Sequence, residues 1–223
     1  MYACITVYLL PYARSQVEPD APPVLYLYRN APSIVLGRNQ NPWKQCRMGG
    51  LRDAGVSLVR RSSGGGTVYH DLGNTNFCFI GHKSVLGDKA GRHSHAAVVA
   101  GAFVQRFGLP VRVSEERVDL VVADDGPPAV RGAKFSGAAF RVSGERAYYH
   151  GTLLLNADLS ALTHLLYIDE PDAGADVTIT GKDTASVRAP RGVVNLADLP
   201  RVSVQGHETR PLNHESVVAA VGE

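Results

Sequence analysis

Apolar and polar positions along the chain predict short strands joined by turns, with helices between them. Residues 24–28 and 34–36 read as two strands separated by a turn and predict a first hairpin. Residues 135–142 and 147–155 predict a second hairpin around Ser143-Gly144-Glu145. Because strict β-α-β alternation is lacking, the pattern predicts an α+β fold with a mixed, largely antiparallel sheet and flanking helices.

Helices are expected where apolar residues recur at every third or fourth position. The segment 95–107 has apolar residues at i, i+4 and i+8, and Gly108 follows its last one. A second helix is expected after a cap at Asn156 or Asp158, where four leucines recur with helical spacing. The pattern at 214–221 is typical of the opening of a helix.

Composition favours a single globular domain that covers residues 1–223. The chain is 44% hydrophobic, which suffices for a full core, and its 23 basic and 21 acidic residues are spread along it. No basic block of the kind that binds nucleic acid or an anionic membrane is present, and no apolar stretch approaches membrane-spanning length. We therefore expect neither nucleic acid nor a membrane as a partner.

The three cysteines give no sign of a disulfide framework or a zinc site. Cys4, Cys46 and Cys78 are odd in number, far apart and without C-x-x-C spacing. A reducing compartment follows as the default expectation.

The sequence RRSSGGGTVYHDLGN, residues 60–74, carries the strongest chemical signal. Three consecutive glycines cost backbone entropy and bury no side chain, but their amides can approach a ligand closely. Strand-like segments flank the run, so it is short and held at both ends, which favours a ligand loop over a flexible linker. With Arg61 just upstream, the loop is typical of a phosphate cradle.

Two further charged residues stand out against apolar surroundings. Lys134 lies between small residues at a strand entrance, where alternation would place it on one face with Ser136 and Ala138. Asp119 lies inside an apolar strand, where a carboxylate needs a cation partner or a metal, and Mg²⁺ beside nucleotide phosphates is the natural candidate. His150 could line a pocket, although a single histidine is more often structural.

Known nucleotide motifs do not match. The chain contains no G-x-x-x-x-G-K-[ST] run and no G-x-G-x-x-G run that opens a helix after a strand. The glycine loop therefore belongs to another class of ligand loop.

Three ordered motifs carry a family resemblance. RRSSGGGTVYHDLGN, GAKFSGAAFR and YYHGTLLLNADL together resemble the lipoate-protein ligase A family of the biotin/lipoate ligase superfamily, over residues 24–199. The resemblance implies a class II synthetase-like catalytic domain. It also implies a two-step reaction, in which ATP activates lipoate to lipoyl-AMP and the lipoyl group passes to a lysine of an acceptor protein.

The resemblance also implies roles for individual residues. The residues expected to hold ATP and the adenylate are Arg61, Gly66, Thr67, Val68, Tyr69 and Lys134. Those expected to hold lipoate are Lys134, His70, Gly137 and Ala138. Lys134 would contact both the lipoate carboxyl and the α-phosphate, so it is the predicted catalytic residue. Strand alternation adds Val68 and Phe140 to the predicted apolar slot.

Cofactors, partners and compartment follow from the same resemblance. It implies ATP, Mg²⁺ with Asp119 as a ligand, and lipoate as substrate. It implies lipoyl domains of 2-oxoacid dehydrogenase E2 subunits, or the glycine-cleavage carrier protein, as acceptors. These acceptors are mitochondrial in eukaryotes and cytoplasmic in bacteria, and motifs also seen in fungal members favour mitochondria.

The chain departs from the family pattern at three places. Residues 1–16 lack the usual opening element, and a small C-terminal accessory domain is absent, so a domain truncated at both ends is expected. Val118 stands where the family usually has asparagine. Members without the accessory domain often need a partner protein for adenylation.

Three alternatives compete with a ligase. One is a lipoyl or octanoyl transferase that uses a pre-formed donor and a cysteine nucleophile, with Cys78 as the cysteine near the motif. The others are a non-catalytic binding module, which should have lost its charged motif residues, and a biotin ligase, which should carry arginines inside its glycine loop. Retention of Lys134 and GGG favours the ligase.

Overall fold

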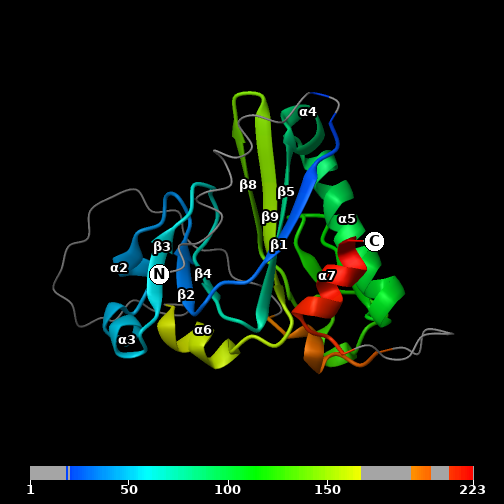
Figure 1. The fold of residues 1–223 in the computed structure, drawn as a ribbon. Helices are drawn as coiled ribbons and strands as arrows, with labels where there is room; N and C mark the ends of the chain where they lie inside the picture. Colours follow the sequence, from blue (N-terminus) through cyan, green and yellow to red (C-terminus); the bar gives the residue numbers. More distant parts are fainter. Residues whose placement is uncertain (1–18, 20, 167–191, 202–210, 223) are drawn as a thin grey trace.

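The computed structural model describes residues 19, 21–166, 192–201 and 211–222, and a four-stranded sheet is its centre (Figure 1). Its strands are β1 (Val24–Tyr28), β5 (Asn74–His82), β9 (Arg146–Leu154) and β8 (Ala138–Ser143), in that order, and every neighbouring pair is antiparallel. The hairpin predicted around Ser143-Gly144-Glu145 is the β8–β9 hairpin.

Two smaller sheets complete the strand content of the described residues. One has the order β3 (Ser57–Arg60), β2 (Ser33–Leu36), β4 (Val68–His70), with β2 parallel to β3 and antiparallel to β4. The other pairs β6 (Val111–Val113) with β7 (Leu120–Val122) in antiparallel register. The hairpin predicted from residues 24–28 and 34–36 is wrong, because β1 pairs with β5 whereas β2 pairs with β3 and β4. The predicted mixed, largely antiparallel α+β architecture is confirmed.

Helices cover both parts of the molecule (Figure 1). Beside the large sheet lie α4 (Lys83–Leu86), α5 (Lys89–Phe107) and α7 (His214–Gly222). Beside the small sheet lie α2 (Pro42–Gln45), α3 (Met48–Asp53) and α6 (Leu159–Leu165). Two short 3₁₀ turns are η2 (Pro128–Val130) and η3 (Leu196–Asp198).

Helix boundaries follow from capping side chains. Helix α5 begins before the predicted residue 95, because the Asp88 carboxylate accepts from the Gly91 amide and caps the helix there. It ends at Gly108, which adopts the left-handed conformation with φ of 63°. Of the two predicted caps for α6, Asp158 is the one used, and it accepts from the Ser160 and Ala161 amides.

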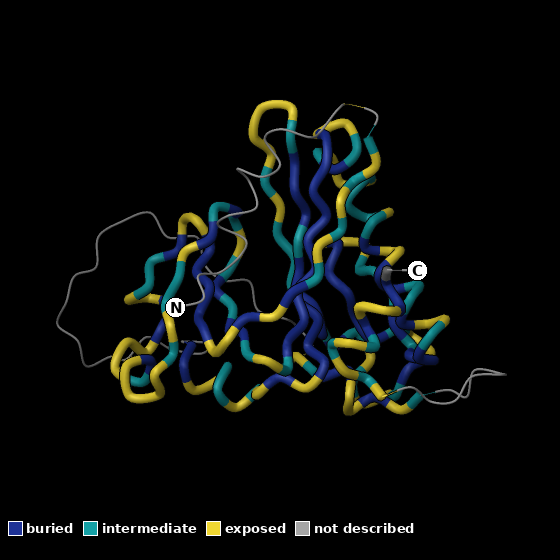
Figure 2. Tube along the Cα trace, viewed as in Figure 1, coloured by how far each residue is buried: buried dark blue, intermediate teal, exposed yellow. Residues whose placement is uncertain are grey.

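Buried residues, dark blue in Figure 2, lie in both parts of the molecule, and their side chains form two main clusters. The larger lies between the four-stranded sheet and α5, with Phe77, Phe103 and Tyr149 among its fully buried members. The smaller lies between the three-stranded sheet, α3 and α6, around Ile34 and Leu51. The chain therefore has two cores within one fold.

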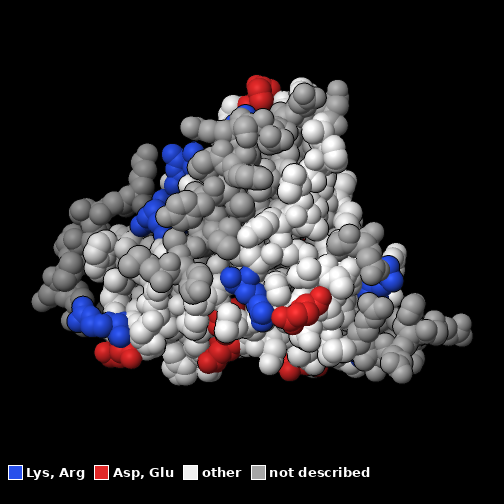
Figure 3. All heavy atoms as spheres, in the orientation of Figure 1, with Lys and Arg blue, Asp and Glu red and all other residues white. Residues whose placement is uncertain are grey.

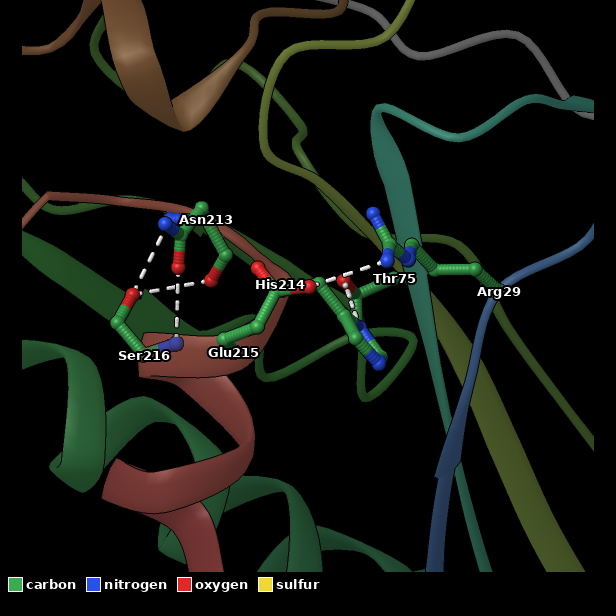
Figure 4. Close-up of polar contacts among 6 residues, drawn as sticks. All are labelled: Arg29, Thr75, Asn213, His214, Glu215 and Ser216. Atoms are coloured by element: carbon green, nitrogen blue, oxygen red, sulfur yellow. Dashed lines mark hydrogen bonds and ion pairs between the residues drawn. The ribbon is translucent and has the colours of Figure 1, made fainter.

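Helix α7 is fixed to the large sheet by polar contacts as well as by apolar packing (Figure 4). The Arg29 guanidinium donates to the Glu215 carboxylate at 3.1 Å, and the Thr75 hydroxyl and His214 Nδ1 are hydrogen-bonded at 3.0 Å. Val217 is fully buried in the larger core. The helical opening predicted from 214 onward is confirmed.

Charged groups do not gather on the face shown in Figure 3. Basic and acidic side chains lie there in small separate groups, some of them side by side. Within the described parts of the chain, no helix combines the length and apolar character needed to cross a membrane.

Candidate functional site

A cavity of about 230 Å³ brings together the residues predicted to bind ATP, lipoate or a metal, except Tyr69 and Phe140. Its lining includes Arg61, Gly66, Thr67, Val68, His70, Asp119, Lys134, Gly137 and Ala138. These residues come from the glycine loop, from β4, from the end of the β6–β7 hairpin and from the approach to β8. Segments more than 70 residues apart in the sequence thus meet at one site.

Tyr69 is the predicted adenylate residue that does not line this cavity. Its side chain is 6% exposed and packs in the smaller core with Ile34 and Leu51. Val68 and His70, its neighbours on β4, do line the cavity, because successive side chains of a strand point to opposite faces.

Arg61 is buried and uses its guanidinium to shape the glycine loop. Nη2 donates to the carbonyls of Gly64 at 2.7 Å and Gly66 at 2.6 Å, Nε donates to Gly64, and Nη1 donates to Val35 on β2 at 3.0 Å. Arg61 thus holds carbonyls of the glycine loop, which leaves the loop amides as candidate phosphate donors. Arg61 also lines the cavity, so its predicted role in holding ATP stays a prediction.

Two glycines allow the loop to lie against its neighbours. A Cβ at Gly37 would lie 1.9 Å from the Gly65 carbonyl oxygen, so the two backbones meet without room for a side chain. Gly65 itself has φ of 88°, which glycine adopts readily. The exposed Arg60 donates to the carbonyls of Gly37, Arg38 and Gln40 and so fixes the opposing turn.

Lys134 and Asp119 form the charged centre of the cavity. Lys134 Nζ lies 2.7 Å from Asp119 Oδ2, and Asp119 Oδ1 accepts from the Ala138 amide at 3.0 Å. The Asp119 side chain is 9% exposed and that of Lys134 is 26% exposed. The buried carboxylate thus has its cation partner, and the ammonium still borders the cavity.

The main chain holds Lys134 by a different arrangement from the predicted strand. Strand β8 begins only at Ala138, and Lys134 forms isolated bridges with Val121 and Val193. Its amide donates to the Gly192 carbonyl, and its carbonyl accepts from the Val194 amide, each at 3.0 Å. Ser136, predicted on the same face, is 1% exposed and absent from the cavity lining, so that prediction is wrong.

Two buried histidines border the cavity in the neutral state. Burial, reinforced by the Arg61 charge, lowers the pKa of both His70 and His150 to about 3. Asn30 Nδ2 lies 2.8 Å from His70 Nδ1, and the Ser63 hydroxyl lies 2.7 Å from His150 Nε2. At neutral pH these rings add polarity to the lining but no charge.

Several lining residues were not singled out from the sequence: Asn76, Arg117, Gly151 and Thr152, with His150 left undecided. The Thr152 hydroxyl accepts from the Gly137 amide at 2.9 Å, and a Cβ at Gly151 would lie 2.6 Å from the Phe77 ring. The H-G-T run in a predicted strand could have indicated them, because a glycine within a strand often marks a place where a ligand approaches the backbone closely. Nothing local pointed to Arg117.

Phe140 lies at a neighbouring cavity instead of the predicted slot. This second cavity, of about 380 Å³, shares Gly65, Arg117, Ala138 and Ala139 with the first. Phe140 is 46% exposed, and the Arg92 guanidinium carbon lies 3.7 Å from its ring centroid. Lys89, Arg92 and Arg117 make the second cavity basic, against one acidic residue, Glu116.

The described residues do not form a protein-held metal site. No group of three or more His, Cys, Asp or Glu side chains among them is arranged to hold a metal ion. Both Asp119 oxygens already have partners, in Lys134 and Ala138. A Mg²⁺ ion at this site would depend chiefly on substrate phosphates.

Curated relatives and solved structures resemble the chain. The lipoate-protein ligase A of Bdellovibrio bacteriovorus is 37% identical over 198 residues, which are 89% of this chain and 50% of that protein. The chain thus spans about half the length of that curated relative. P. falciparum LipL1 in complex with lipoate is 31% identical over 71% of this chain and 43% of its own, with a TM-score of 0.57.

The other two structures cover most of the chain. A bipartite lipoate protein ligase of Thermoplasma acidophilum, studied with its E2 lipoyl domain, is 25% identical over 97% of this chain and 74% of its own, with a TM-score of 0.68. A lipoate-protein ligase A bound with ATP is 21% identical over 97% of this chain and 76% of its own, with a TM-score of 0.66, and this likeness concerns the fold.

The family model described as the lipoyl protein ligase A/B catalytic domain matches residues 10–221, which is nearly the whole chain. The resemblance read from the three motifs and the observed architecture agree with that match. The chain belongs to the lipoyl protein ligase A/B catalytic domain family.

Proposed function

We propose that this protein is a lipoate-protein ligase, which activates lipoate with ATP to lipoyl-AMP and transfers the lipoyl group to a lysine of an acceptor domain. The observation that carries the proposal is the position of Lys134, whose ammonium borders the cavity that the glycine loop and the predicted lipoate residues also line. The names of its relatives, one bound with ATP and one with lipoate, support it.

In the first step, a lipoate carboxylate oxygen attacks the α-phosphorus of ATP, and the bond to pyrophosphate breaks. The reaction brings two anions together, and negative charge develops on the phosphoryl oxygens. A fixed ammonium about 4 Å from those oxygens contributes roughly 4 kcal/mol at an effective dielectric constant of 20. Lys134 is placed for this role because its backbone and its ammonium are both held.

The second cavity suits the pyrophosphate that leaves. It adjoins the first at Gly65 and carries Lys89, Arg92 and Arg117, so a polyanion that moves away from Lys134 meets positive charge. Gly64 and Gly65 line the second cavity as well. Val35 and Val68 and the neutral His70 and His150 offer uncharged side chains to the lipoyl tail, and the Arg61 guanidinium beside them is bound to the Val35 carbonyl.

In the second step, the acceptor lysine amine attacks the lipoyl carbonyl, AMP leaves and the amine loses a proton as the amide forms. The E2 lipoyl domain studied with the Thermoplasma ligase supports lipoyl domains of 2-oxoacid dehydrogenases as acceptors. The glycine-cleavage carrier protein is a second proposed acceptor, on the family resemblance alone. The compartment we propose is that of the acceptors, mitochondrial in a eukaryote and cytoplasmic in a bacterium.

Mg²⁺ enters the proposal as a companion of the ATP phosphates, whose charge it would reduce. Asp119 is the carboxylate nearest to Lys134, but its oxygens are engaged, so we assign no step to the metal.

A cysteine-dependent transferase is the alternative, and thiol chemistry disfavours it. Burial raises the pKa of the Cys46 and Cys78 thiols to about 12, so neither is a thiolate at neutral pH. Neither cysteine lines the cavity. Cys4 lies outside the described residues.

The test is lipoate-dependent exchange of labelled pyrophosphate into ATP. We expect exchange by the wild-type chain and a loss of at least about 100-fold in Lys134→Ala, since the fixed cation acts on the transition state. Lys83→Ala is the matched control, because Lys83 is a partly exposed lysine that pairs with Glu145 away from the cavity. Equal exchange by wild type and Lys134→Ala would refute the role of Lys134. Absence of exchange in the wild type, with transfer from supplied lipoyl-AMP retained, would restrict the chain to the second step.

A further inference from the structure

Val118, the residue before Asp119, has an unusual backbone conformation. Its φ is 61°, and it is the one residue other than glycine with positive φ in the described parts of the chain. A β-branched residue is strained there, because its Cβ crowds the following carbonyl. Val118 is 5% exposed and lies at the end of the loop between β6 and β7. Strain of this kind persists only where the surroundings enforce it.

A buried hydroxyl enforces it here. The Tyr149 hydroxyl donates to the Val118 carbonyl at 2.8 Å, and the Val118 amide donates to the Ser114 carbonyl at 3.1 Å. Tyr149 belongs to β9, is 1% exposed and packs on Phe77 with 5.5 Å between ring centroids. Burial raises the pKa of its phenol, which therefore stays protonated and able to donate.

We propose that Tyr149 is a positioning residue, which holds Val118 in the left-handed conformation and thereby fixes Asp119 and, through it, the Lys134 ammonium. The connection is short: the Tyr149 hydroxyl binds the Val118 carbonyl, the next residue is Asp119, and Asp119 Oδ2 lies 2.7 Å from Lys134 Nζ. Tyr149 also lines the second cavity, but its hydroxyl is engaged by the Val118 carbonyl, so the role proposed for it is to position Lys134 through Asp119. Its link to catalysis rests on the proposed function.

The consequence for rate follows from this geometry. Without the hydroxyl, the Val118 carbonyl loses its donor, and φ is free to relax toward the extended region that valine prefers. Rotation at Val118 turns the Asp119 carboxylate and removes the fixed partner of Lys134. A displacement of about 1 Å in a catalytic group can lower a rate by up to about 100-fold.

The experiment measures pyrophosphate exchange by Tyr149→Phe in two backgrounds. In the native background we expect kcat to fall about tenfold, with KM for ATP changed less than about twofold, because the loss concerns the transition state. In a Val118→Asn background the same change should cost less than about twofold, since asparagine tolerates positive φ without help. Val118→Gly serves as the second background if the asparagine variant does not fold.

A control separates positioning from general destabilisation. Phe107→Leu removes packing from the larger core, where Phe107 stacks on Phe103, and should lower the midpoint of urea unfolding without lowering kcat. The proposal is wrong if Tyr149→Phe leaves kcat unchanged, or if it costs as much in the Val118→Asn and Val118→Gly backgrounds as in the native one.

A second readout does not depend on the proposed function. The same four proteins give a double-mutant cycle in urea unfolding, where we expect Tyr149→Phe to lower the midpoint less once Val118 is replaced. A wild-type chain without exchange would refute adenylation, while the unfolding cycle would still decide whether Tyr149 holds Val118. If the two substitutions shifted the urea midpoint additively, coupling between Tyr149 and Val118 would be excluded.

Discussion

Lys134 and Arg61 border the same cavity as cations, but the protein holds them in opposite ways. Lys134 is paired with one carboxylate and is 26% exposed, so its ammonium can also contact an incoming anion. Arg61 is 5% exposed and donates to carbonyls of Val35, Gly64 and Gly66. The comparison separates a cation that we propose acts on substrate from one that shapes the glycine loop. Charge and position near a ligand do not by themselves distinguish the two.

The two cations also belong to different parts of the fold. Lys134 precedes β8 of the large sheet and is fixed to the β6–β7 hairpin, beside the larger core. Arg61 follows β3 of the small sheet, which has its own core. We therefore expect changes on the small-sheet side to act through loop shape, and changes at Lys134 to act on rate.

Gly37→Ala should give the largest effect on the small-sheet side. The new Cβ would lie 1.9 Å from the Gly65 carbonyl oxygen, and neither backbone can move without displacing the loop. We expect a loss of about 3 kcal/mol in the free energy of unfolding, together with loss of ATP binding. Urea unfolding and calorimetry measure the two effects.

Gly49→Ala is the matched control, with the opposite sign. Gly49 lies in α3, and a methyl group added there would have nothing within 4 Å, so alanine should raise stability by up to about 1 kcal/mol through helix propensity. Equal tolerance of alanine at both glycines would show that the close approach of the two loops is unnecessary.

Arg61→Lys should have the next largest effect. A lysine ammonium cannot span the Val35 carbonyl on one side and the Gly64 and Gly66 carbonyls on the other, although it keeps the charge. We expect about 2 kcal/mol lower stability and weaker ATP binding. If Arg61→Lys left stability and ATP binding unchanged and lowered only the catalytic rate, Arg61 would act on substrate, as proposed for Lys134.

Arg60→Lys sharpens the same comparison. Arg60 is exposed, and a single nitrogen, Nη1, donates to the three carbonyls of the opposing turn. A lysine can replace part of that set, so we expect a loss below about 1 kcal/mol. Thermal and urea unfolding of Arg60→Lys and Arg61→Lys, measured together, would show which of the two adjacent arginines contributes more to stability.

Acid should destabilise the protein gradually through the histidines between these two regions. His70 and His150 have folded pKa values of about 3, below the ordinary 6.5, so the unfolded chain binds protons that the folded chain does not. The stability is fully present above pH 6.5 and is lost as pH falls toward 3, by about 1 kcal/mol per pH unit for each histidine. Urea unfolding measured between pH 5 and 7 should show that the free energy of unfolding changes less steeply with pH in His150→Asn than in the wild type. If the free energy of unfolding changed equally with pH in both proteins, His150 would take up its proton in the folded protein as it does in the unfolded chain.

Local sequence signals predicted much of the fold. The β8–β9 hairpin follows from the turn at Ser143-Gly144-Glu145, and α6 follows from the Asp158 cap and its leucines. Alternation alone could have separated Tyr69 from Val68 and His70, because all three lie on β4. The motif was transferred as a block of residues, which did not distinguish the two faces of β4.

Other features depend on contacts that local patterns do not contain. The partner of Asp119 proved to be Lys134, fifteen residues later, and the conformation of Val118 depends on the hydroxyl of Tyr149 on β9. Arg61 reaches the Val35 carbonyl because β2 lies beside β3 in three dimensions. Such pairings form only when the sheets come together in the fold. The type of a buried polar residue therefore indicates that it needs a partner, but not which residue the partner is.

The Asp119–Lys134 pair has a consequence for how substrate is chosen. Before any ligand arrives, the ammonium already has its counter-ion, so the cavity offers an incoming carboxylate no unbalanced positive charge at that point. A carboxylate must then compete with Asp119 through fit, with its tail in the uncharged lining. Partly buried pairs are screened little by salt, so lipoate affinity should depend only weakly on ionic strength. The site would thus distinguish acids by the shape of the chain behind the carboxylate, at any salt concentration the cell presents.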